Sequence, residues 1–124
     1  MSWIDQSFEE FGRTIGVAGL RPREDGRLSL RIGAEQRLDF VVLEDAVLML
    51  LVRPFQGSER LLALRRAFDA CHLRHGWSTN VRAGLTRGGD LIFLATLPAR
   101  EFRPNTVEQA FNLLARLHER VAHR

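Results

Sequence analysis

The chain contains no lysine, because all eighteen of its basic residues are arginine, set against fifteen acidic residues for a formal charge of +3. A lysine-free chain has no P-loop lysine and no Schiff-base lysine, which excludes the enzymes built on either group. The arginines are interleaved with the acids, and the tightest group is the pair Arg65 and Arg66. This distribution favours a solvated mixed-charge surface and makes nucleic-acid binding the alternative interpretation.

Cysteine and long apolar runs are also scarce. Cys71 is the only cysteine, so an internal disulfide is excluded. The longest uncharged apolar run, from Ala46 to Val52, is far shorter than the roughly 18 residues that span a bilayer. The first residues, MSWIDQSFEEF, are acidic and amphipathic where a secretory signal would be basic and then apolar. We therefore expect a cytoplasmic protein with no membrane segment, folded as a single domain over residues 1–124.

Two apolar strands are predicted between Leu38 and Val52, joined at Glu44 and Asp45. A two-residue turn there places Leu43 opposite Ala46. One face then carries Asp39, Val41, Leu43, Ala46, Leu48, Leu50 and Val52, and the other carries Leu38, Phe40, Val42, Val47, Met49 and Leu51. A sheet that is apolar on both faces needs a cover on both. We expect the first and last helices to cover one face, and the second helix with a symmetry mate to cover the other.

The remaining elements follow from periodicity and turn residues. The first helix is predicted from a cap at Ser2 to Gly16, and the second from a cap at Ser58 to about His75. The other strands are predicted over Leu28–Ile32, Trp77–Leu85 and Leu91–Leu97, and the last helix from a cap at Asn105, with His118 on its surface. The predicted fold class is α+β in the order α-β-β-β-α-β-β-α, a twisted antiparallel sheet flanked by three helices.

This order, with its local patterns, resembles the class I chaperones of bacterial type III secretion systems. The resemblance lies in FEEFGRTIGV, in EDGRLSLRI leading into LDFVVLEDAVLMLLVRP, and in GGDLIFLATLPAREFRPNTVEQAFNLLARLHERV, and it covers nearly the whole chain. It implies a cytoplasmic homodimer with no enzymatic activity. Such a dimer binds the N-terminal chaperone-binding segment of a secreted effector and keeps it soluble and export-competent.

The resemblance also implies two sets of site residues. The dimer interface of the family, formed by the second helix and the fourth strand, maps onto Leu61, Leu64, Phe68, Cys71, Val81, Ala83 and Leu85. The effector-binding surface maps onto Phe8, Phe11, Ile15, Leu28, Leu30 and Ile32. Chaperones of this family are typically acidic, whereas this chain has a pI near 10.8, so an acidic client segment would suit it best.

Chemical sites are expected to be absent. Cys71, His72 and His75 lie close together on the second predicted helix, and they raise the alternatives of a nucleophile or a metal pair. No further ligand cluster or orienting acid accompanies them, and we predict no cofactor, no metal and no catalytic residue. An arginine-rich nucleic-acid-binding or regulatory domain is the alternative function.

Overall fold

The computed structural model describes residues 3–55, 59–72 and 80–123. Its elements are α1 (Trp3–Ile15), β1 (Arg27–Ile32), β2 (Gln36–Val42), β3 (Ala46–Arg53), α2 (Arg60–Ala70), β4 (Asn80–Leu85), β5 (Leu91–Pro98), the short 3₁₀-helix η2 (Ala99–Glu101) and α3 (Pro104–His123). The predicted α+β class and element order are confirmed. Among the described helices, none combines the length and the apolar character that crossing a bilayer requires.

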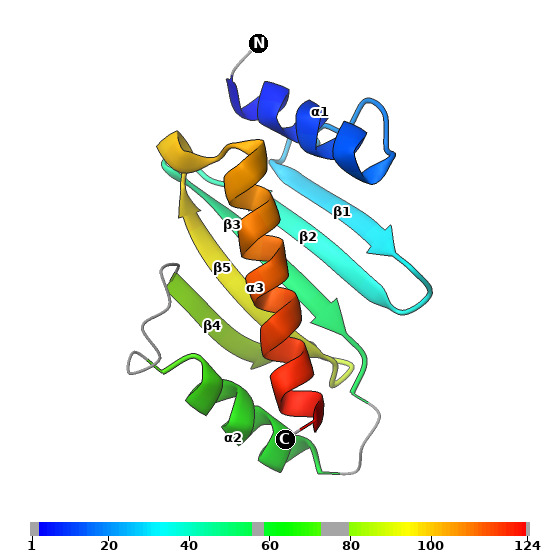
Figure 1. Cartoon of the computed structure of the whole chain (residues 1–124), viewed down its shortest axis with the longest axis vertical. Helices are drawn as coiled ribbons and strands as arrows, with labels where there is room; N and C mark the ends of the chain where they lie inside the picture. The colour runs from blue at the N-terminus through cyan, green and yellow to red at the C-terminus, as the bar shows by residue number, and fades with distance from the viewer. Residues whose placement is uncertain (1–2, 56–58, 73–79, 124) are drawn as a thin grey trace.

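The strands form one antiparallel sheet in the order β1-β2-β3-β5-β4 (Figure 1). The first three strands are a meander, as predicted, and β5 continues the sheet beside β3. Since β4 pairs with β5 alone and β1 with β2 alone, these two strands are the edges of the sheet.

The central hairpin has the predicted register. Leu43 donates its backbone N–H to the carbonyl of Ala46 at 2.8 Å, and Val42 pairs with Val47 in the first ladder position beyond the turn. The two predicted faces are therefore the two real faces of β2 and β3. The face that holds Leu38, Phe40 and Met49 is called the inner face below, and the opposite one the outer face.

The inner face carries the core. Four aromatic rings meet where α1 crosses the sheet, with the ring centroids of Phe8 and Phe40 5.1 Å apart and those of Phe8 and Phe102 4.7 Å apart. Phe11 packs against Phe40 from the next turn of α1. The buried hydroxyl of Ser7 donates to the carbonyl of Phe102 at 2.8 Å, which fixes α1 against the segment that leads into α3.

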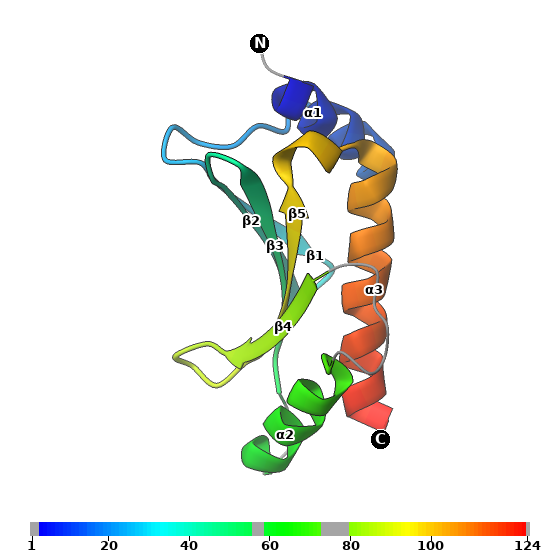
Figure 2. The ribbon, with the colours of Figure 1, turned by 90° about the vertical axis from the view of Figure 1, so that its left-hand side faces the viewer.

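The outer face has no helix on it in the part of the chain that the structure describes. In Figure 2, α1 and α3 lie on one side of the sheet and the opposite side is open. Helix α2 contacts α3 and β4 instead. Within one chain α2 therefore does not cover the second face, and a cover that includes the α2 of a symmetry mate stays a prediction.

Two predicted helix boundaries also differ from the structure. Helix α2 ends at Ala70 rather than near His75; its predicted cap Ser58, the residues 73–79 and the start of the predicted fourth strand lie outside the described residues. Helix α3 begins at Pro104, because proline fits the first turn, where its missing N–H costs no hydrogen bond. Asn105 is therefore in the first turn of α3 and is not its cap.

Candidate binding surfaces

The cluster at Cys71 and His72 can be examined within the described residues. Burial raises the pKa of the Cys71 thiol to about 11, so the sulfur stays protonated and lacks the thiolate that nucleophilic chemistry needs. No group of three or more histidine, cysteine, aspartate or glutamate side chains that could hold a metal occurs in the described part of the chain. His75 lies outside it. The surfaces that remain candidates are apolar.

Helix α2 turns its small side chains inward and its large ones outward. Ala63, Ala67 and Ala70 are buried, whereas Leu61 is 78% exposed and Phe68 is 55% exposed. Large apolar side chains usually gain about 1.5–3 kcal/mol when they leave water, so this outward face is costly in an isolated chain. Leu61 and Phe68 are the two most exposed large apolar side chains among the residues that the structure describes.

The predicted dimer set spreads over this face and the neighbouring strand. Leu64 on α2 and Cys71 directly after it are half-buried, and Leu85 at the end of β4 is 37% exposed. Ala83 is half-buried, while Val81 is buried against the core. Because α2 contacts β4, the exposed members of the predicted set lie on two neighbouring elements.

The predicted effector-binding set divides into buried and accessible residues. Phe8 and Phe11 lie in the aromatic cluster beneath α1 and have almost no exposed surface. Ile15 is 41% exposed at the end of the same helix. In the free chain, the two phenylalanines hold α1 in place, and their contact with a client stays a prediction.

The other three members of that set lie on β1. Leu28, Leu30 and Ile32 stand on the inner face opposite Phe40, Leu38 and Gln36, and each is half-buried at the margin of the core. Because β1 is an edge strand, the backbone groups on its unpaired side are not used by the sheet. Half-covered apolar side chains beside a free strand edge are the geometry that strand addition requires.

The outer face of the sheet carries an apolar centre between two polar rims. Pairing places the side chains in three rows across the strands. From β1 to β4 the rows are Arg31, Arg37, Val52, Ile92 and Gly84; then Ser29, Asp39, Leu50, Leu94 and Arg82; then Arg27, Val41, Leu48, Thr96 and Asn80. The apolar residues gather on β3 and β5, and no predicted site residue belongs to this face.

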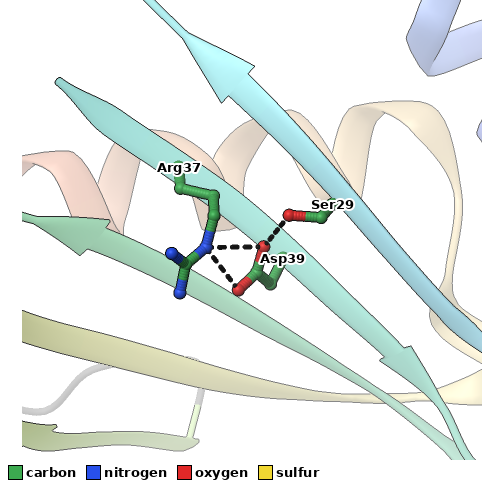
Figure 3. A network of polar contacts seen from close by, with 3 residues as sticks. All are labelled: Ser29, Arg37 and Asp39. Carbon is green, nitrogen blue, oxygen red and sulfur yellow. Dashed lines mark hydrogen bonds and ion pairs between the residues drawn. The ribbon is translucent and has the colours of Figure 1, made fainter. Parts of the chain in front are cut away.

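One polar network ties β1 to β2 on the outer face (Figure 3). Arg37 donates its Nε–H to both carboxylate oxygens of Asp39, at 2.9 Å and 3.1 Å. The Ser29 hydroxyl donates to Oδ1 of Asp39 at 2.5 Å. Asp39 is thus occupied by two neighbours from its own chain, and its charge is balanced by Arg37.

An open cavity of about 880 Å³ lies on the inner side, near the C-terminal end of α3. Arg53, Phe55, Leu62, Arg66 and His118 are among its lining residues. Arg53 donates from Nε to the side-chain oxygen of Gln36 at 2.7 Å. Its lining combines two acids, Glu35 and Glu59, with two arginines, Arg53 and Arg66, and with apolar side chains.

His118 was predicted on the surface, and this is wrong. It is 4% exposed; its Nε2–H donates to the carbonyl of Leu51 at 2.7 Å, and its ring packs edge-on against Phe93 at 4.8 Å between centroids. Burial lowers the pKa of the imidazole to about 4, a shift that the Leu51 hydrogen bond opposes and the charge of Arg53 assists. The signal was present in the sequence, because His118 follows Leu114 by four residues on the apolar side of α3.

Comparison with known proteins places these surfaces in context. A family model described as type III secretory system chaperone SycN matches residues 3–122. No individual curated protein matches the chain by sequence.

Several solved structures share the fold. A chain of the complex of the Yersinia pestis secretion chaperone SycH with a YscM2 fragment is 14% identical, with a TM-score of 0.66 over 96% of this chain and 98% of that one. The ExsC–ExsE complex matches with 18% identity and a TM-score of 0.74, covering 91% and 86%. The HopA1–SchA chaperone–effector complex matches with 16% identity and a TM-score of 0.68, covering 95% and 89%.

Proposed function

Because this chain belongs to the family of type III secretory system chaperones, we propose that it works in the bacterial cytoplasm as a homodimer that binds a secreted effector. The dimer would hold the N-terminal segment of that effector soluble and competent for export. Chaperones of this family are not enzymes, and binding of this kind requires apolar surface rather than a catalytic group. The observation that carries the proposal is the family match over nearly the whole chain.

The exposed face of α2 supports the dimer. In a twofold interface each residue of the patch is used twice, so Phe68 and Leu61 of both copies would leave water together. At about 1.5–3 kcal/mol for each buried phenylalanine, the two copies of Phe68 alone would contribute about 3–6 kcal/mol. Leu64, Cys71 and Leu85 would extend the interface, and buried Val81 with half-buried Ala83 on β4 would support it from the core side.

The edge at β1 supports client binding. A client strand added there would pair with outward backbone groups of β1 beyond Arg27, whose N–H and carbonyl are already bonded to Asp25 and Arg23. Its side chains would lie beside Leu28, Leu30 and Ile32. Ile15, exposed at the end of α1, would add a further apolar contact. Such an addition orders only a segment of the client, so the rest of the client could stay unfolded and ready for export.

Two variants separate the surfaces. Phe68→Asp should convert the dimer to monomers at micromolar concentration, measured by sedimentation velocity, because it would bury one charge from each copy. Leu30→Asp should leave the dimer intact and prevent co-purification of the effector segment on co-expression.

Arg116→Asp, a charge change at an exposed position on α3, is the matched control for both variants. Dimer loss in Leu30→Asp, or a wild-type chain that is already monomeric, would contradict this division of surfaces. Failure of every effector N-terminal segment from the same bacterium to co-purify with the wild-type chain would contradict the function.

A further inference from the structure

The outer face of the sheet has a chemical character that goes beyond general client binding, and the following inference rests on the proposed function. Its centre is made by Leu48 and Leu50 of β3 with Ile92 and Leu94 of β5, all half-buried by their neighbours and covered by no helix among the described residues. Val41 and buried Val52 continue this apolar centre. An apolar strip of two central strands is thus open to a partner.

The charges beside the apolar centre are almost all positive. Arg27 and Arg31 stand on β1, Arg37 on β2 and Arg82 on β4, so arginines border the strip on both sides. In the three rows described above, the only acid is Asp39, which Arg37 and Ser29 already occupy. Arg27, Arg31 and Arg82 are exposed and form no ion pair within the described residues.

The backbone of β3 and β5 restricts the kind of occupant. Both strands are paired on both sides, so they offer no backbone hydrogen bonds to a strand laid across the outer face. A helix satisfies its own backbone and needs only an apolar stripe toward the sheet. With a diameter of about 10–12 Å, a helix covers two to three strands spaced about 4.8 Å apart. Resting over β3 and β5, it would lie beside Arg82 on β4. On the other flank, the long side chain of Arg31 on β1 would reach toward it across β2.

We propose that the outer face binds an amphipathic helix of the client whose apolar stripe is flanked on both sides by aspartate or glutamate. Leu48, Leu50, Ile92 and Leu94 receive the stripe, and Arg31 and Arg82 pair with the acidic flanks and select this class of client. Because the rims are exposed, their charges steer binding and discriminate between clients more than they add affinity. The occupant is a protein helix rather than a nucleic acid, because apolar aliphatic side chains fill the centre where bases would need stacking partners.

A synthetic peptide tests the chemistry directly. The probe is a blocked helical peptide of about 18 residues, or five turns, with leucines in one stripe and glutamates on both flanks. The first control replaces each glutamate with lysine, and the second has the same composition in an order that destroys the stripe. The acidic probe should bind, measured by fluorescence anisotropy, and lose affinity as salt is raised. Equal binding of the acidic and basic peptides would overturn the proposal.

Variants of the chain locate the contact. The double variant Arg31→Glu and Arg82→Glu should lower the affinity for the acidic probe roughly tenfold or more. The same variant should raise the affinity for the lysine control peptide. Leu50→Asp should abolish binding of the acidic probe. Arg116→Glu on α3 also lowers the net charge, but it lies away from the outer face. It should therefore have little effect on the affinity for the acidic probe. If Arg116→Glu lowered the affinity for the acidic probe as much as the double variant does, net charge rather than the outer face would govern binding.

Further outcomes separate the inference from the function. If an effector segment still co-purifies with the rim double variant as well as with the wild type but is lost with Leu50→Asp, the acidic-helix inference fails and the chaperone function stands. If Leu50→Asp makes the protein monomeric, a second copy covers this face and the inference fails. If heparin or duplex DNA competes with the acidic probe and binds more tightly than it does, nucleic acid is the occupant and the inference fails.

Discussion

His118 should make the stability of this protein depend on pH below neutrality. In the folded chain the ring is buried against Phe93, and its Nε2–H donates to the carbonyl of Leu51. Burial holds its pKa at about 4, against an ordinary value of 6.5. Because the folded pKa lies below the unfolded one, the unfolded chain binds a proton more readily between these two values, and acid favours unfolding.

The magnitude follows from the two pKa values. Neutral His118 makes its full contribution to the free energy of unfolding above about pH 6.5. This contribution declines as the pH falls toward 4. At about 1.4 kcal/mol for each pKa unit, the loss in unfolding free energy reaches about 2 kcal/mol at pH 5 and about 3 kcal/mol near pH 4. A protein with a stability of about 5–15 kcal/mol would lose a substantial part of it.

The assay is urea unfolding followed by circular dichroism from pH 7.5 to pH 4.5, at one protein concentration because self-association would change the apparent stability. The comparison is His118→Gln, which keeps an N–H donor and does not titrate. The variant should be less stable than the wild type at pH 7.5, and the gap should narrow by about 2 kcal/mol by pH 5. Parallel decline of the two proteins over this range would refute the reasoning.

Two further substitutions test how the core and the turns are built. Phe8→Ala should lower the free energy of unfolding by about 3–5 kcal/mol, because Phe8 packs on Phe40 and Phe102; an unchanged melting temperature would show that α1 is not docked as described. Gly26→Ala should destabilise the protein by about 1–3 kcal/mol, since φ is +81° and the new methyl would lie 2.7 Å from the carbonyl oxygen of Val42. Gly33→Ala, with φ of +66° and open space around it, is the control and should cost less, so equal losses in thermal melts would contradict the steric argument.

The central hairpin was predictable because its pattern leaves few registers. With Glu44 and Asp45 as the turn, alternation assigns the other residues from Leu38 to Val52 to a face, and the structure has this assignment. The type III secretion chaperone family was also predictable, since it depends on the order and spacing of whole elements, and the match over residues 3–122 confirms it.

The surfaces were less predictable than the elements. On α2 the sequence shows large apolar residues and alanines together, and it does not say which side faces the core; the structure buries Ala63 and Ala67 and leaves Leu61 and Phe68 outside. The open outer face was missed for a related reason. Its apolar centre was predicted from alternation, but whether a helix covers it depends on how the chain crosses from β3 to α2, which periodicity does not encode.

Native mass spectrometry of the complex that co-purifies with an effector segment tests the chaperone proposal most directly. It weighs the assembled chains in one measurement, so self-association and client binding are read together. We predict two copies of this chain with one copy of the segment, and two copies alone when the segment is removed. A chain that is monomeric in both cases, or that binds no effector segment, would contradict the account.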